Sequence, residues 1–259
     1  MTLNYKEFGQ GEPLLILHGL FGMLDNWQSI AKKLSEHFLV YIIDQRNHGK
    51  SPHSDDYNYD ILADDLLEFM EARGLRSAHL VGHSMGGKTA MHFALRYPAA
   101  VRSLVVVDIA PRAYQGGHEA YFEAMLALDL TKIKERKEAE HFLATRIADA
   151  AELQFLLKNL SRNDVTDEHF EWKMNLRSLY RNYPTIMGGV GAAGETLDKP
   201  TLFVRGGRSQ YIREDDKELI LTRFPKAQLV TIPNAGHWVH AEQPEAFLAA
   251  ITDFLVPQR

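Results

Sequence analysis

Short apolar runs alternate with amphipathic stretches in the first and last parts of the chain. The apolar runs are LLIL at 14–17, LVYII at 39–43, HLVG at 79–82, SLVVV at 103–107, TLFVRG at 201–206 and AQLVTI at 227–232. Runs of this kind, separated by helical patterns, are typical of βαβ units, whose parallel sheet is covered by helices on both faces. We therefore predict an α/β fold with a mostly parallel central sheet.

Helices are predicted between these runs, where apolar residues recur at helical spacing. They cover residues 27–35, 61–72 and 85–96, a polar stretch near 213–223 and a closing helix at 243–255. Arg73-Gly74 and Tyr97-Pro98 stand where helix stop signals are expected.

The alternation stops between residues 113 and 197. This segment has no run that is typical of a buried strand, and its apolar residues recur at helical spacing in AYFEAMLALDL, EHFLATRIADA and AELQFLLKNL. Because strands and helices resume after it, the segment interrupts a domain rather than following one. We predict an α/β core from residues 1–112 and 198–259, with residues 113–197 as a helical cap inserted into it.

Composition and charge limit the classes of partner and the cellular compartment that we expect for this protein. The formal charge is −5, and the basic cluster at 132–137 contains Ile133 and Glu135, as a solvated helix face would, so nucleic acid is not expected as a partner. The chain has no cysteine, which excludes disulfides and thiolate metal sites and suits a reducing compartment. No apolar run approaches the ~20 residues of a membrane span, and the first residues lack a signal-peptide pattern. We expect a cytoplasmic protein without an integral membrane segment; the oligomeric state is left open.

The segment Gly82-His83-Ser84-Met85-Gly86 follows a predicted strand and opens a predicted helix. This is the context of a G-x-S-x-G nucleophile elbow, in which a sharp turn exposes the serine and small residues permit close backbone approach. A serine that merely caps the helix is the alternative, which both flanks disfavour. We predict Ser84 as a nucleophile, the N–H of Met85 as an oxyanion donor and His83 as a packed neighbour.

A serine nucleophile needs a base, and IPNAGHWVHAEQP offers one after the last predicted strand. His237 follows Gly236 in this loop and is the predicted base, whereas His240 is expected to support the loop. Early in the chain, HGLFG at 18–22 ends a strand where a second oxyanion donor is needed. Leu20 is the predicted donor through its backbone N–H, with Phe21 as the second choice.

Several motifs together resemble a known family. HGLFG, DQRNHGKS at 44–51, GHSMGGK at 82–88, VVDIAP at 106–111 and AGHWVHAEQP at 235–244, in this order, are similar to those of the YbfF-type esterases of the α/β-hydrolase superfamily. The resemblance covers nearly the whole chain. It implies the α/β-hydrolase fold and a serine esterase that needs no metal and no organic cofactor.

The acid of the triad departs from the commonest pattern of that superfamily. A Gly-x-x-Asp sequence is expected after the penultimate strand, but the position counted from Gly206 holds Ser209. Asp108, at the end of the strand SLVVV, is the alternative that the resemblance also implies, and we predict it as the acid. The competing candidates are Asp215 and Asp216, which fall in a predicted surface helix, and Asp44. Asp44 is expected to fix the DQRNHGKS loop by accepting backbone N–H groups and pairing with a guanidinium.

These residues predict hydrolysis of a carboxylic ester or an acyl thioester through an acyl-enzyme. A C–C bond hydrolase or a perhydrolase with the same triad is an alternative, and a sensor of small ligands with little turnover is another. The predicted cap would lie over the substrate pocket, and its aromatic residues are candidate pocket walls, although packing of the cap helices against one another is the favoured interpretation for most of them. A cationic group in or beside the cap would attract an anionic leaving group such as that of coenzyme A, although an isolated surface cation is the commoner case. The candidate cations are Arg112, Lys158 and Arg177, and the candidate pocket residues are Phe21, Tyr114, Phe122, Phe155, Trp172, Tyr180 and Trp238.

Overall fold

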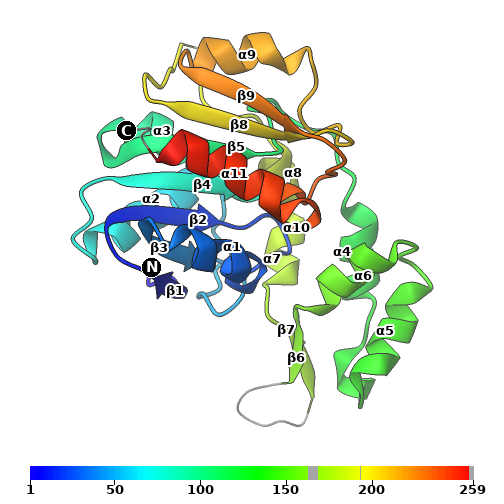
Figure 1. Ribbon diagram of the computed structural model, residues 1–259. Coiled ribbons are helices and arrows are strands. Elements are labelled where there is room, and N and C mark those ends of the chain that lie inside the picture. The colour runs from blue at the N-terminus through cyan, green and yellow to red at the C-terminus, as the bar shows by residue number, and fades with distance from the viewer. Residues whose placement is uncertain (163–168, 193, 257–259) are drawn as a thin grey trace.

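The computed structural model describes residues 1–162, 169–192 and 194–256. These residues form a central sheet in the order β1-β3-β2-β4-β5-β8-β9, in which β1 pairs antiparallel with β3 and the other pairings are parallel (Figure 1). The strands are β1 Tyr5–Phe8, β2 Glu12–Leu17, β3 Phe38–Ile43, β4 Ala78–His83, β5 Val101–Val107, β8 Thr201–Gly206 and β9 Ala227–Ile232. The predicted α/β architecture with a mostly parallel sheet is confirmed.

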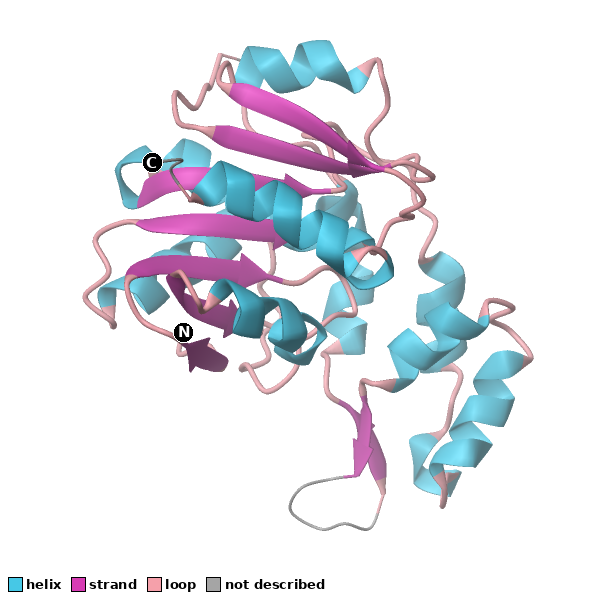
Figure 2. Cartoon of the chain, viewed as in Figure 1, coloured by secondary structure: helices cyan, strands magenta, loops and turns pink. Residues whose placement is uncertain are grey.

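Helices cover both faces of this sheet (Figure 2). One face carries α2 Tyr59–Glu71, α3 Met85–Arg96 and α9 Asp216–Arg223, and the other carries α1 Gln28–Leu34, α10 Val239–Glu242 and α11 Pro244–Leu255. Short 3-10 helices occur at Leu24–Trp27, Pro98–Ala100 and Leu130–Lys132.

The alternation of side chains along each strand explains the two hydrophobic cores. In β2, Leu15 and Leu17 face the core under α2 and α3, whereas Leu14 and Ile16 face the core under α1 and α11. Neighbouring side chains of a strand point to opposite faces, so a strand covered on both sides reads as one apolar run. This is why LLIL was recognisable from the sequence.

The segment between β5 and β8 packs around a third hydrophobic cluster. Figure 2 shows it as a lobe beside the sheet. Its helices are α4 Glu119–Leu126, α5 Arg136–Ala144, α6 Ala150–Leu157, α7 Leu176–Arg181 and α8 Tyr183–Met187. Residues 163–168 and 193 of the predicted cap lie outside the described residues.

Three strands, β1, β6 and β7, were not predicted. The hairpin of β6 Leu160–Arg162 and β7 Phe170–Trp172 lies within the segment that was expected to be wholly helical, and strands this short give no readable alternation. The antiparallel edge strand β1 has the sequence YKEF and is half-buried or exposed throughout. It has no fully buried face, so its pattern does not differ from that of a loop.

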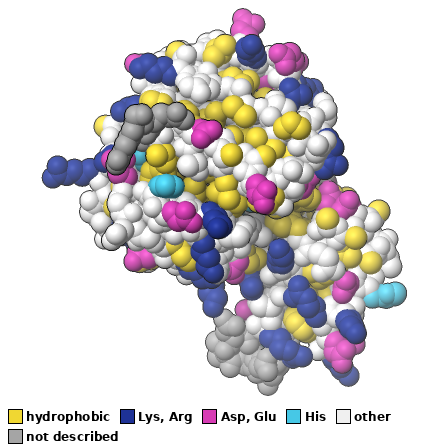
Figure 3. All heavy atoms as spheres, viewed as in Figure 1, with side chains coloured by type: hydrophobic (Ala, Val, Ile, Leu, Met, Phe, Trp, Pro, Cys, Tyr) yellow, Lys and Arg dark blue, Asp and Glu magenta, His cyan; other side chains and the backbone are white. Residues whose placement is uncertain are grey.

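Charged side chains of both signs share the face seen in Figure 3, where no continuous basic surface appears. None of the helices that the structure describes combines the length and the apolar character needed to cross a membrane.

Candidate active site

Ser84 lies at the sharp turn between β4 and α3. Its backbone has φ 53° and ψ −119°, outside the regions that serine ordinarily adopts. A Cβ on Gly82 would lie 2.3 Å from the main-chain oxygen of Gly86, and a Cβ on Gly86 would lie 2.4 Å from that of Leu17. Only glycine fits at these two positions, so the flanking residues of the motif are required by the turn itself.

Parallel strands bring distant loops to one edge of the sheet. The carboxyl ends of β4, β5, β8 and β9 meet there, since His83 pairs with Val107 and Gly206 pairs with Ile232. Ser84 and Asp108 are the first residues after β4 and β5, and His237 follows β9 in a loop. Ligands of open α/β sheets bind at this edge.

Asp108 is fully buried and contacts His237 directly. His237 Nδ1 lies 2.8 Å from Asp108 Oδ2, and Gly206 N donates to Oδ1 at 2.9 Å. Ser209 Oγ also donates to Oδ2. In the commonest pattern of the superfamily, the turn after β8 carries the acid of the triad. Here that turn instead supplies hydrogen-bond donors to the carboxylate of Asp108.

The other acidic candidates have different partners. Asp215 is exposed before α9, and Asp216 pairs with Arg112 at 2.8 Å. Neither lines the cavity that contains Ser84.

Asp44 holds its loop, as expected, but no guanidinium among the described residues pairs with it. It accepts from the backbone N–H groups of Leu24 at 2.7 Å and Lys50 at 2.9 Å. The expectation that a guanidinium pairs with Asp44 was wrong for Arg46, which instead contacts Asp65 at 2.6 and 2.8 Å.

Both the imidazole of His237 and its main chain have contacts that hold them in place. The ring of Tyr211 stacks on it with centroids 3.8 Å apart and an interplanar angle of 18°. His83 Nε2 donates to the main-chain oxygen of His237 at 2.8 Å, and burial lowers the pKa of His83 well below its usual value. His83 is therefore a neutral donor to the loop. Tyr114 donates to the main-chain oxygen of Tyr211 at 2.6 Å and so fixes the turn that carries the stacking ring.

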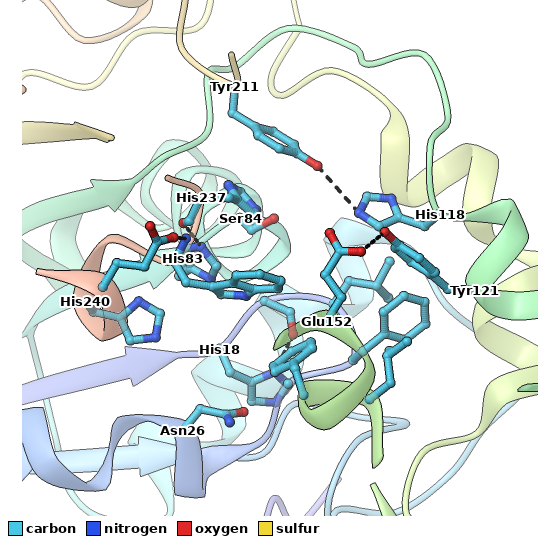
Figure 4. A pocket seen from close by; sticks show the side chains of 18 of the residues that line it. His18, Asn26, His83, Ser84, His118, Tyr121, Glu152, Tyr211, His237 and His240 are labelled. Carbon is cyan, nitrogen blue, oxygen red and sulfur yellow. Dashed lines mark hydrogen bonds between the residues drawn. The ribbon is translucent and has the colours of Figure 1, made fainter. Parts of the chain in front are cut away.

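Ser84 and His237 line one cavity of about 370 Å³ (Figure 4). No hydrogen bond joins their side chains among the residues that the structure describes; such contacts often tighten only when substrate is bound. The backbone N–H groups of Leu20 and Met85 donate to no other backbone group in the described ranges. They remain available to a ligand.

The predicted pocket residues divide into groups. Phe21, Phe155 and Trp238 line the large cavity, and Tyr114 lines a smaller cavity of about 20 Å³ that Ser84 also borders. Trp172 lines neither, because β7 packs it against the cluster of the inserted segment.

Phe122 and Tyr180 also line neither cavity. Their rings stack on each other with centroids 5.0 Å apart, and Phe122 is fully buried. Both belong to the packing of the inserted segment.

The candidate cations do not reach the cavity either. Arg112 is paired with Asp216, and Lys158 and Arg177 are exposed. No lysine or arginine in the described ranges lines the large cavity.

Buried polar side chains join the inserted segment to the rest of the chain. Lys88, one turn after Ser84 on α3, donates to the main-chain oxygens of Met187, at 3.1 Å, and Gly188, where α8 ends. Burial lowers the pKa of Lys88 to about 7. Asn159, just after α6, donates to the main-chain oxygen of Phe21 at 2.7 Å. Elements of the segment thus contact both α3, which follows the predicted nucleophile, and the predicted oxyanion loop.

Sequence reasoning missed several residues that line the cavity. His118, Tyr121, Glu152 and Tyr211 belong to it, and His118 borders the small cavity as well. Burial lowers the pKa of His118 to about 4, so it is neutral near pH 7. No motif surrounds these residues, so nothing in the sequence marked them as part of the site. The described residues contain no group of three or more His, Asp or Glu side chains placed to hold a metal.

The free energy of unfolding is expected to decrease as the pH is lowered, because several histidines are buried in the neutral form. Burial lowers the pKa of His18 to about 4 and the pKa values of His48 and His240 to about 3. A histidine in the unfolded chain titrates near pH ~6.5. Between that pH and about 4, the unfolded chain binds more protons, and each histidine costs up to ~1.4 kcal/mol of stability per pH unit as pH falls. Urea unfolding should give a lower free energy of unfolding at pH 5 than at pH 7.

His240→Phe tests this directly. The ring of His240 stacks on Trp27 with centroids 3.9 Å apart and an interplanar angle of 10°, which phenylalanine can reproduce without a titrating nitrogen. The slope of unfolding free energy against pH should become smaller in His240→Phe but not in the control His141→Phe, which changes an exposed histidine on α5. An unaltered slope in His240→Phe would contradict the assignment of His240 as neutral.

Known proteins resemble this chain over nearly its whole length. The model of the alpha/beta hydrolase fold family matches residues 12–244. The sn-1-specific diacylglycerol lipase ABHD11 of Mus musculus is 40% identical over 93% of this chain and 80% of its own length. Esterase YbfF of Escherichia coli (strain K12) is 36% identical over 94% of this chain and 92% of its own length. A solved structure of a marine microorganism esterase is 45% identical with a TM-score of 0.95, and the match covers 98% of this chain and 99% of the esterase.

Proposed function

Because this chain belongs to the alpha/beta hydrolase fold family, we propose that it is a serine carboxylesterase that acts through an acyl-enzyme on Ser84. The observation that carries the proposal is the buried contact between Asp108 and His237 at the edge of a cavity that Ser84 also lines. Relatives named as an esterase and a lipase support an ester as the substrate.

In the proposed acylation step, Ser84 Oγ attacks the ester carbonyl and His237 Nε2 takes its proton. The negative charge on the carbonyl oxygen is held by the N–H groups of Leu20 and Met85, each worth about 3 kcal/mol in such sites. His237 then returns the proton to the leaving alkoxide, and the C–O bond to the alcohol breaks. Asp108 accepts from Nδ1–H throughout, which keeps the imidazole in the required tautomer.

Deacylation repeats these steps with water as the nucleophile. His237 removes a proton from water, and the hydroxide adds to the acyl carbon. The collapse of this second tetrahedral intermediate releases the acid and returns the proton to Ser84.

We propose that residues 113–197 act as a cap that supplies substrate-binding side chains. Phe155 and Glu152 of this segment line the cavity. An oxygen ester is favoured over a thioester of coenzyme A, since the wall of the cavity offers carboxylates rather than cations to a phosphorylated leaving group.

A series of acyl chains, each assayed as a neutral oxygen ester and as a coenzyme A thioester, tests the proposal. We expect the oxygen esters to show the higher kcat/KM, and a fluorophosphonate probe to label Ser84. Higher kcat/KM for the coenzyme A thioesters would contradict the ester assignment. Failure of the probe to label Ser84 would contradict the mechanism.

A further inference from the structure

One wall of the large cavity is formed by a single face of α6. Glu152, Phe155 and Leu156 line the cavity and stand at positions i, i+3 and i+4, which share a face of a helix. The ring of Phe155 lies 5.3 Å from that of Trp238, centroid to centroid. Trp238 is the residue after His237, so this wall adjoins the proposed general acid that protonates the leaving alcohol.

Glu152 has no cationic partner among the described residues. Its hydrogen-bond partner is the hydroxyl of Tyr121, which donates to Oε2 and fixes the carboxylate in the cavity (Figure 4). Burial and the contact with Glu152 raise the pKa of Tyr121, so the hydroxyl keeps its proton and remains a donor.

The charge of the second carboxylate in the cavity wall, that of Glu242, is neutralised by a cationic partner. Glu242 pairs with Arg208 at 2.7 Å and accepts from the backbone N–H of Gly236 at 2.8 Å. Within the described ranges, the charge left facing the cavity is therefore that of Glu152, and it is negative.

We infer that the cavity between Glu152, Phe155 and Trp238 binds an ammonium group carried by the alcohol part of the substrate. The inference rests on the proposed esterase function and names its preferred substrates: esters of amino alcohols or of quaternary ammonium alcohols. A cation is attracted to the faces of aromatic rings, and most strongly when it is also partly desolvated beside a carboxylate. The half-buried rings and the carboxylate of Glu152 provide both attractions.

The test compares two isosteric esters of one short acid, the choline ester and the neutral 3,3-dimethylbutyl ester. They differ in one atom, nitrogen or carbon, and hence in charge but hardly in shape. We expect kcat/KM to be about 10-fold higher for the choline ester, since cation–π and charge contacts of ~1–2 kcal/mol correspond to such a ratio. Added salt should reduce the ratio.

Glu152→Gln removes the negative charge, but the glutamine can still accept a hydrogen bond from the hydroxyl of Tyr121. The ratio of kcat/KM for the choline ester to kcat/KM for the neutral ester should therefore fall toward about 2. The matched control is Glu140→Gln on α5, where Glu140 accepts from Gln154 and does not line the cavity. The control should keep the wild-type ratio. Equal kcat/KM for the two esters in the wild-type protein, or an unchanged ratio in Glu152→Gln, would overturn the inference.

Binding separates this inference from the proposed function. Calorimetry on Ser84→Ala gives Kd for the two esters without turnover, and the choline ester should bind about 10-fold more tightly. Hydrolysis of both esters at the same rate would leave the esterase function standing and remove the ammonium site. Tighter binding of the choline ester without any hydrolysis by the wild-type protein would support the ammonium site and contradict the esterase function.

Discussion

Ser84→Ala is expected to lower kcat for ester hydrolysis by roughly 10⁵- to 10⁶-fold, the loss typical of removing a serine nucleophile. Alanine keeps the backbone of the turn but has no hydroxyl to form the acyl-enzyme. The thermal midpoint should change little, because the Ser84 hydroxyl has no hydrogen-bond partner among the residues that the structure describes. Steady-state kinetics with an activated short-chain ester, together with thermal unfolding, measures both effects.

A serine outside the cavity provides the control. Ser35 lies at the end of α1, where its hydroxyl donates to the main-chain oxygen of Lys32 at 2.8 Å, and Ser35→Ala should keep the wild-type kcat. A Ser84→Ala protein that still turns over the ester at a tenth or more of the wild-type rate would refute Ser84 as the nucleophile.

Asp108→Asn is expected to lower kcat by about 10⁴-fold, as loss of the acid does in other serine hydrolases. Three donors converge on this carboxylate, from Gly206, Ser209 and His237. An asparagine has one acceptor oxygen, so it cannot satisfy all three, and its amide favours the wrong tautomer of His237. The loss should appear in kcat rather than in KM, since Asp108 is fully buried and does not line the cavity.

Asp215→Asn is the matched control, because Asp215 is an exposed aspartate beyond the penultimate strand. It should retain wild-type kcat. Near-normal turnover by Asp108→Asn, or a large loss in Asp215→Asn, would move the role of the acid away from Asp108.

The sheet was predictable because its inner strands are buried on both faces. LVVV at 104–107 and LLIL at 14–17 are apolar at every position, and this requirement of a covered parallel strand is visible in the sequence. The strand Tyr5–Phe8 escaped prediction because its antiparallel pairing with Phe38–Ile43 at the sheet edge leaves it without a buried face. Its formation depends on a partner distant in the chain.

The site was predictable where local backbone geometry dictates the residues. The turn at Ser84 admits only glycine two positions before and two positions after the serine, so the motif was recognisable in the sequence. The family resemblance that it helped to carry is now confirmed by the match to the alpha/beta hydrolase family. Tyr211 and Glu152 were not predictable in this way. Tyr211 stacks on the ring of His237, which is 26 positions away in the sequence. Glu152 faces the cavity only because α6 packs beside it. Neither contact requires a particular pattern of neighbouring residues.

The contact between Asn159 and the oxygen of Phe21 limits how this enzyme can be redesigned. Asn159 is buried and lies just after α6, the helix whose face carries Glu152 and Phe155. Phe21 belongs to the loop with the proposed oxyanion donor Leu20. Exchanging the segment for that of another hydrolase, in order to transplant a substrate preference, would also remove a support of the loop that carries the proposed oxyanion donor. A functional chimera therefore has to inherit Asn159 together with the HGLFG turn, as one transferable unit.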